Sequence, residues 1–311
     1  IQPLSATKFD FSDSAWDQNV MKDYTINGKA YATSLKNTHL GSVNMIFYNK
    51  ALIDKYDLEN PYLLWKNGKW TMNKFIQMCE EYKKATKTEH SCTGGWWEYW
   101  SMIYGIQGPV KYDGKKYSNN VKDKTFLTVT QKIAEWYNTK EYLAEGRAEQ
   151  FNAGEALFYA GQSVLARRKN VYFSDLKAEN NFYAVPMPAV DGQKTYYQGR
   201  GEYEAYAIAD GAKNPEAVPY FLRYFLDGEN YDLKNFFCNP QNLEVYNWCM
   251  NQKNTIWSTG YKEGGDDFGN FGSAGIASLK GNQIKSYVDA NSAVIDKRVT
   301  NFNNALGKIK K

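Results

Sequence analysis

A cluster of aromatic side chains follows two glycines in the stretch GGWWEYW, residues 94–100. Three of the nine tryptophans and one tyrosine lie within these seven positions. Tyr and Trp rings have an apolar face and a polar tip, so they suit contacts with a ligand that is flat and polar at its edges. We expect Trp97, then Trp96, then Tyr99 to contact such a ligand, and Trp100 to join the core. The alternative is that all four rings pack internally, because Trp96 and Trp100 are also spaced for one helix face.

Sequence motifs of the common enzyme classes are absent. There is no G-x-S-x-G elbow, H-E-x-x-H pair, Walker loop or dinucleotide fingerprint. The two histidines, His39 and His90, are too few for a histidine-based metal centre. Asp266–Asp267 lacks the alternating oxygen ligands of a calcium loop. We therefore expect no metal or cofactor. Glu98 and Glu202 lie among aromatic residues, so a glycoside hydrolase that uses a pair of carboxylates remains an alternative.

Composition and charge exclude several further classes. The 311 residues are enough for two domains, and the net charge of +4 is scattered, with its densest run in the final GKIKK. That pattern argues against a nucleic-acid partner. No apolar stretch approaches the length of a transmembrane helix. Because the chain begins with Ile1 and shows no signal-peptide pattern, we expect a processed chain or a fragment.

Four cysteines leave two redox states open. Cys238 and Cys249 could form a disulfide in an oxidising compartment. Four free thiols, with Cys79 and Cys92 included, are equally compatible with the spacing because no C-x-x-C pair occurs.

Strand and helix patterns alternate along the chain. Asn27–Gly28 predicts a two-residue hairpin turn, and Thr71 predicts the start of a helix. The apolar and amphipathic patterns predict strands at 42–48, 156–161 and 182–188, and helices at 49–58, 72–86, 124–143 and 214–227. This alternation is typical of an α/β fold with a largely parallel sheet. Residues 229–275 are rich in Asn, Gly and aromatics, and we expect them to be mostly irregular.

Three segments in this order and spacing resemble one family. They are FYNKALIDKYDLENP followed by WTMNKFIQMCEEYKKA, then FNAGEALFYAG, then FYAVPMPAVDG followed by GRGEYEAYAIADGAKNPEAVPYFLRYFL. Together they resemble the extracellular solute-binding proteins of ABC importers, in the group that includes maltose-binding protein. The resemblance covers nearly the whole chain. The family normally begins with a further strand and helix, which are absent here, so we expect the first lobe to be incomplete.

The resemblance implies a type II periplasmic-binding-protein-like fold, in which two α/β lobes are hinged around a ligand cleft. We place lobe one at residues 1–36 and 207–260, and lobe two at 44–197 and 261–311. The hinge crossings would be 37–43 and 198–206.

The resemblance also implies a carbohydrate ligand, because an indole covers the C–H face of a sugar ring while polar groups bind its hydroxyls. Besides the three aromatic residues above, the candidate ligand-binding residues are Arg200, Glu202, Tyr203, Gly161, Gln162, His39, Trp257 and Phe271. A hinge salt bridge is the alternative for the residues of the second crossing, and a surface position is the alternative for His39.

The expected function is non-catalytic. The protein would be a monomer outside the cytoplasmic membrane, either a lipid-anchored lipoprotein or periplasmic, and would deliver a mono- or oligosaccharide to the membrane permease of an ABC transporter. A carbohydrate-active enzyme, or a solute-binding protein with a ligand other than a sugar, remains as the alternative.

Overall fold

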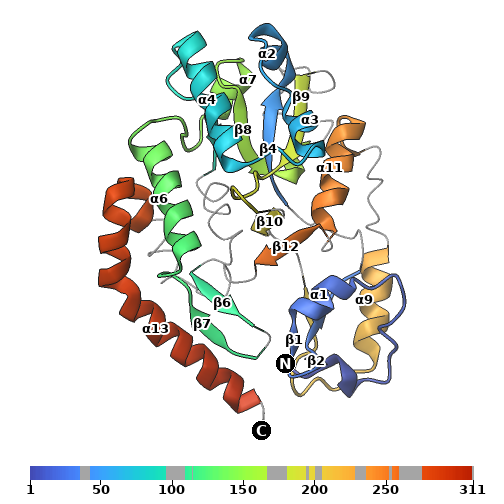
Figure 1. The fold of residues 1–311 in the computed structure, drawn as a ribbon. Coiled ribbons are helices and arrows are strands. Elements are labelled where there is room, and N and C mark those ends of the chain that lie inside the picture. Colours follow the sequence, from blue (N-terminus) through green and yellow to red (C-terminus); the bar gives the residue numbers. More distant parts are fainter. Residues whose placement is uncertain are drawn as a thin grey trace.

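The chain folds into two bodies, each with its own hydrophobic core. The computed structural model describes residues 1–35, 43–95, 109–113, 115–166, 181–193, 196–199, 205–227, 236–251, 254–258 and 275–309. Figure 1 shows a larger body at the top and left and a smaller body at the lower right. The long helix α13 (Ile284–Ile309) runs along the flank of the larger body.

The larger body is built on a four-stranded sheet in the order β5-β8-β4-β9. Its strands are β5 (Cys92–Gly94), β8 (Phe158–Gln162), β4 (Asn44–Asn49) and β9 (Phe182–Pro186). Every residue of β4 is buried, which confirms the buried strand predicted near 42–48.

The sheet is mixed, so the prediction of a largely parallel sheet is wrong for the strands that the structure describes. The strands β5 and β8 are parallel, but β4 runs antiparallel to both of its neighbours. Those neighbours reach β4 only after more than a hundred residues of intervening chain. Alternation of helix and strand along the sequence therefore did not indicate their direction, since antiparallel strands need no nearby crossover helix.

The helix α11 (Pro240–Met250) completes the outer edge of this sheet. The side chain of Asn242 accepts a hydrogen bond from the backbone N–H of Ala184 at 2.8 Å. The amides of Asn239 and Asn242 donate to the carbonyl of Phe182 at 2.9 and 3.1 Å. These side-chain amides form hydrogen bonds with backbone groups of β9 that would otherwise be free to pair with another strand.

The helix α11 also shows that the prediction of mostly irregular structure at 229–275 is wrong for 240–250. Asn239 accepts a hydrogen bond from Asn242 N and is followed by Pro240 at the first helical position. That pair is a helix-start signal, and it was readable in the sequence.

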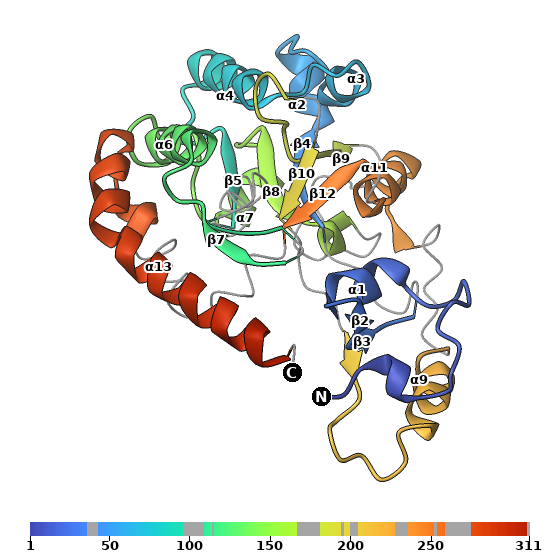
Figure 2. The same cartoon turned by 60° about the horizontal axis from the view of Figure 1, so that its bottom comes forward.

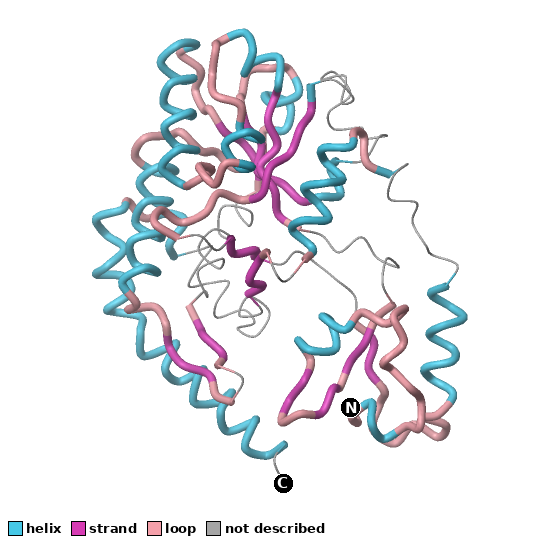
Figure 3. Tube along the Cα trace, turned by 45° about the vertical axis from the view of Figure 1, so that its right-hand side comes forward, coloured by secondary structure: helices cyan, strands magenta, loops and turns pink. Residues whose placement is uncertain are grey.

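The remaining helices of the larger body surround the sheet, as Figures 1 and 3 show. They are α2 (Lys50–Lys55), α3 (Pro61–Lys66), α4 (Met72–Thr86), α6 (Lys124–Asn138) and α7 (Ala148–Asn152), with short 3-10 turns at Ser163–Ala166, Ile276–Ser278 and Gly281–Gln283. Thr71 caps α4 by accepting a hydrogen bond from Lys74 N at 3.3 Å, as predicted. The amphipathic helix predicted at 124–143 is α6, which buries Phe126 and Ile133.

Two small pairs of strands lie beside the main sheet. The hairpin of β6 (Val110–Tyr112) and β7 (Tyr117–Asn119) packs against α13, where Asn303 exchanges two hydrogen bonds with the backbone of Tyr117. The strands β10 (Tyr196–Gly199) and β12 (Thr255–Ser258) pair in parallel.

The smaller body joins residues 1–35 to residues 205–227. It contains the 3-10 turn Leu4–Ala6, α1 (Gln18–Asp23), β1 (Thr25–Ile26), β2 (Lys29–Ala30), β3 (Ala32–Thr33), β11 (Tyr206–Ala207) and α9 (Ala217–Asp227). The buried residues that form its hydrophobic core cluster are Leu4, Phe11, Trp16, Leu35, Ile208, Leu222 and Leu226. The two segments are also joined by pairing of β3 with β11. The turn between β1 and β2 has positive φ at Asn27 (51°) and Gly28 (78°), which confirms the predicted hairpin.

The helix α9 presents aromatic side chains to solvent. Tyr220, Phe221, Tyr224 and Phe225 are 65%, 61%, 86% and 54% exposed. The rings of Phe221 and Phe225 stack on each other at a centroid distance of 5.6 Å. We call these four side chains the aromatic face of α9. Figure 2 places the helix on the outer side of the smaller body, away from the main sheet.

The four cysteines are buried and free, so the structure has thiols rather than the alternative disulfide. Burial raises the pKa of the Cys79 thiol well above its ordinary value. Among the described residues, no helix combines the length and the apolar character needed to span a membrane.

Candidate functional site

The candidate site lies at one end of the main sheet. The carboxyl ends of β5, β8 and β9 meet the beginning of β4 there, because Asn44 pairs with Gln162 and Met45 pairs with Pro186. In Figure 1 this end of the sheet is turned toward the smaller body. Ligands of α/β proteins bind outside the carboxyl ends of strands, so this end is the natural place for a binding site.

Two amide side chains lie side by side at this end. Asn44 and Gln162 are opposite each other on adjacent antiparallel strands, so their side chains point to the same face of the sheet. Asn44 is buried and Gln162 is half-buried. An amide carries two donors and a carbonyl acceptor, so this pair suits a ligand with many hydroxyl groups. Gln162 was predicted as a site residue. Asn44 was missed, although a polar residue at the start of an apolar run was a signal.

Gly161 is required by close packing. A Cβ at this position would lie 2.6 Å from the Cδ1 of Leu165 and 2.9 Å from the ring of Tyr159. The glycine therefore lets two larger side chains meet over the strand beside Gln162. Gly161 lies next to Gln162 at the candidate site as a packing position, and its predicted contact with a ligand stays a prediction.

Gly94 ends β5, and the aromatic cluster follows it in the sequence. Its φ is +146°, and an added Cβ would lie 2.8 Å from the backbone N of Ala160 and closer still to the carbonyl oxygen. The next residue, Gly95, donates its N–H to that same carbonyl at 3.3 Å. The strand end thus fits only glycine, and it lies two residues along β8 from Gln162.

Most of the predicted site residues lie outside the part of the chain that the structure describes. These are Trp96, Trp97, Tyr99, His39, Arg200, Glu202, Tyr203 and Phe271. Trp257 lies on β12, where its backbone pairs with Gln198 of β10. All nine assignments stay predictions.

A buried tyrosine fixes the start of β10. The hydroxyl of Tyr196 donates to the backbone carbonyl of Trp70 at 3.3 Å, and burial raises its pKa to about 12. Trp70 is itself fully buried and donates its indole N–H to the carbonyl of Pro186 at 2.8 Å. The hydroxyl of Tyr196 therefore remains a protonated donor at neutral pH, and it ties β10 to the end of β9.

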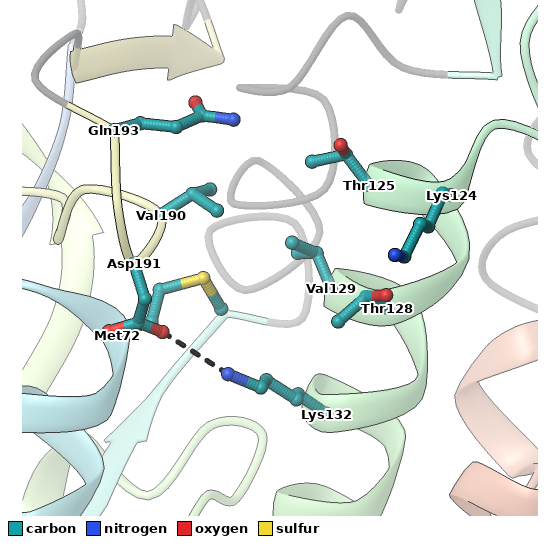
Figure 4. Close-up of a pocket in the computed structure, with 9 residues that line it drawn as sticks. All are labelled: Met72, Lys124, Thr125, Thr128, Val129, Lys132, Val190, Asp191 and Gln193. Atoms are coloured by element: carbon teal, nitrogen blue, oxygen red, sulfur yellow. Dashed lines mark hydrogen bonds and ion pairs between the residues drawn. The ribbon is translucent and has the colours of Figure 1, made fainter.

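A pocket of about 200 Å³ opens on the flank of the larger body (Figure 4). It lies between α6, the first residue of α4 and the turn that follows β9. Its lining residues are Met72, Lys124, Thr125, Thr128, Val129, Lys132, Val190, Asp191 and Gln193. None of these residues was predicted from the sequence, because the three segments are far apart in the chain.

Residues 13–231 match the family model of the bacterial extracellular solute-binding proteins. The chain therefore belongs to this family. No curated protein matches the chain.

Solved structures of similar fold share little sequence with the chain. The galacto-N-biose/lacto-N-biose I-binding protein of an ABC transporter from Bifidobacterium longum has a TM-score of 0.66 at 16% identity, and the match covers 97% of this chain and 78% of that one. The sugar-binding protein MalE from Xanthomonas citri has a TM-score of 0.66 at 11% identity, covering 99% and 81%. UgpB from Mycobacterium tuberculosis, in complex with glycerophosphocholine, has a TM-score of 0.62 at 14% identity, covering 93% and 76%. The chain thus has the two-lobed type II periplasmic-binding-protein-like α/β fold, as predicted.

Proposed function

We propose that this protein binds a mono- or oligosaccharide between its two bodies and delivers it to the membrane permease of an ABC transporter. The observation that carries the proposal is the amide pair Asn44 and Gln162 at the sheet end, beside the Gly94–Gly95 turn that leads to Trp96 and Trp97. Amides supply donors and acceptors for hydroxyl groups, and indole rings supply the flat apolar surface that covers a sugar ring. Two neighbours of the same fold bear names of sugar-binding proteins, which supports this ligand class.

The packing of α11 suggests a revision of the lobe boundaries. Its buried residues Val245, Tyr246 and Cys249 belong to the hydrophobic core of the larger body. We therefore propose lobe one as 1–35 and 205–227, and lobe two as 43–199 and 236–309. The chain still passes between the lobes three times, but the third passage moves from about residue 260 to 228–235, and closure of the lobes around the ligand would bend these connections.

The cellular setting is part of the same proposal. The protein acts outside the cytoplasmic membrane, as a lipid-anchored lipoprotein or in a periplasm, without catalysis and without a nucleic-acid partner. Membership of the extracellular solute-binding family supports this placement.

The competing ligand class is a phosphodiester-containing solute rather than a sugar. UgpB, with glycerophosphocholine bound, has nearly the same similarity of fold as the sugar-binding neighbours. The family therefore accommodates both kinds of ligand on one scaffold, and only a binding measurement separates them.

A thermal-shift panel tests the proposal directly. The purified chain is mixed with mono- and oligosaccharides in one set and with glycerophosphocholine in another, since a ligand that binds the folded state raises the melting temperature. Stabilisation by a sugar, with one-to-one calorimetric stoichiometry and no hydrolysis product, is the expected result. Stabilisation by glycerophosphocholine alone would overturn the carbohydrate assignment, and turnover of the sugar would assign an enzyme using Glu98 or Glu202.

Replacement of a single ring tests the placement of the site. Trp97→Ala should weaken binding of the stabilising sugar by about thirtyfold, as expected for a central aromatic contact worth about 2 kcal/mol. Tyr224→Ala removes an exposed aromatic from the smaller body and is the matched control, because this side chain is 86% exposed on the outer face of α9. If the two variants bind the sugar with equal affinity, the aromatic residues of GGWWEYW pack internally and do not contact the ligand.

A further inference from the structure

The pocket beside α6 has features of a ligand site of its own. It is formed by the first half of α6 on one side and by Met72 and the turn 190–193 on the other, as Figure 4 shows. None of these residues belongs to the sheet-end site, which is formed by the ends of the strands. The two sites are therefore separable by mutation.

The charges of the pocket leave one cation unpaired. Both carboxylate oxygens of Asp191 are engaged, Oδ1 by the backbone N–H of Asn73 at 3.1 Å and Oδ2 by the ammonium group of Lys132 at 3.2 Å. Lys132 also donates to the side-chain carbonyl of Asn73 at 3.0 Å. In the described part of the chain, Lys124 has no ion-pair partner, and Figure 4 shows its side chain directed toward the pocket. The lining therefore carries a net positive charge.

The anion preference does not depend on the helix terminus. The first free N–H groups of α6, those of Thr125 and Phe126, both donate to the side chain of Asp123, at 2.8 and 3.1 Å. The terminus is thus capped within the protein, and the attraction for an anion comes from the side chain of Lys124.

Uncharged polar groups surround the same space. Thr125 and Thr128 lie one helical turn apart on α6, and both line the pocket (Figure 4). On the opposite side, the side-chain amide of Gln193 lines the pocket, and in Figure 4 its nitrogen points across it. The Oε1 atom of the same amide is buried, so the group that Gln193 presents to a ligand is its N–H donor.

The floor of the pocket is apolar. Met72 and Val129 are buried, and Val190 adds a further aliphatic surface from the opposite side. The volume of about 200 Å³ lies below the range of about 300–1,000 Å³ that larger organic ligands occupy, so the pocket fits one ring.

We propose that this pocket binds a monosaccharide that carries a carboxylate, that is, a sugar acid. The carboxylate pairs with the ammonium group of Lys124, the side-chain amide of Gln193 donates to a ring oxygen, and the C–H face of the ring rests on Met72 and Val129. The hydroxyls of Thr125 and Thr128 bond the remaining oxygens. The binding event is separate from capture of the transported solute at the sheet end.

Methyl-labelled methionine gives a readout inside the pocket. The chain has seven methionines, and among those that the structure describes only Met72 lines this space. In protein labelled at the methionine ε-methyl carbons, with the Met72 signal assigned from Met72→Leu, sodium D-glucuronate should shift this signal in a saturable way. D-glucose, which lacks the charge, and sodium acetate, which lacks the ring, should each bind at least about tenfold more weakly, as loss of a charge-assisted hydrogen bond predicts.

Two matched variants decide whether the pocket is responsible. Lys124→Gln should weaken glucuronate binding about tenfold, whereas Lys122→Gln, which removes the same charge two residues outside the lining, should leave it unchanged. Trp97→Ala should also leave it unchanged. The proposal is overturned if glucuronate leaves the Met72 signal unmoved, if the two lysine variants bind equally, or if Trp97→Ala abolishes the shift while Lys124→Gln does not.

Discussion

Replacing Gly94 with alanine should damage both the fold and the binding site. The new Cβ would lie 2.8 Å from the backbone N of Ala160 and closer to its carbonyl oxygen, and these atoms belong to the centre of the sheet. Backbone atoms held in a sheet cannot move aside as a flexible side chain can. Overpacking of this kind costs about 1–3 kcal/mol, and the φ of +146° adds about 1–2 kcal/mol for a residue with a side chain.

The expected loss in the free energy of unfolding is therefore roughly 2–5 kcal/mol. Urea unfolding measures it, with a lower midpoint and an unchanged slope. The matched control is Gly68→Ala, because Gly68 has a φ of +67° and no atom within 4 Å of the added Cβ. This control should lose only the backbone contribution of about 1–2 kcal/mol.

The comparison of the two variants separates steric conflict from backbone strain. If Gly94→Ala and Gly68→Ala destabilise the protein equally, the close approach of β5 to Ala160 is not what holds the strand end. The folded fraction of Gly94→Ala should also bind ligand less tightly than the control, because Gly95 and the aromatic residues after it must shift. If Gly94→Ala binds the ligand as tightly as the control, Gly94 and Gly95 do not help to form the binding site.

Three further changes test other parts of the structure. Asn242→Ala should lower the free energy of unfolding by about 2–4 kcal/mol, because it leaves the N–H of Ala184 buried without an acceptor. The control Asn282→Ala, at an exposed position, should change it by less than about 0.5 kcal/mol. Urea midpoints measure both, and equal midpoints would refute the view that Asn242 stabilises the edge strand β9. Burial raises the pKa values of Tyr48 and Tyr246, so the folded state favours their protonated forms. Their contribution to the free energy of unfolding is fully present below the unfolded tyrosine pKa of about 10 and falls as the pH rises beyond that value. Urea unfolding between about pH 8 and about pH 11 should show this fall. A free energy of unfolding that does not change over this range would contradict the prediction. Tyr224→Lys should shorten the retention of the protein on a hydrophobic-interaction column without lowering its melting temperature, because the Tyr224 ring is 86% exposed. Unchanged retention would mean that the aromatic face of α9 is not accessible.

Local signals predicted many elements correctly because each depended on neighbours in the sequence. The Asn27–Gly28 turn, the Thr71 cap and the buried strand β4 all follow from short patterns. The direction of the strands beside β4 depended instead on pairing across more than a hundred residues, and no local pattern encodes it.

The candidate site was only partly predictable for the same reason. Gln162 was found at a strand end, but its partner Asn44 is 118 residues away in the sequence and becomes a neighbour only through the register of β4 and β8. The pocket lined by Lys124 and Gln193 joins segments that share no motif. The helix α11 was missed because its composition suggested a loop, although Asn239 and Pro240 marked its start.

The construction of the smaller body from two distant segments has a consequence for the order of folding. The backbone N–H of Lys8 is held by the carboxylate of Glu216, 208 residues later in the chain. Residues 1–35 are synthesised before their partners at 205–227, which follow only after the whole main sheet has been made. At about 5–20 residues per second this interval is on the order of ten to thirty seconds. During that time the large rings of Phe11 and Trp16 lack the part of their core that Ile208, Leu222 and Leu226 supply.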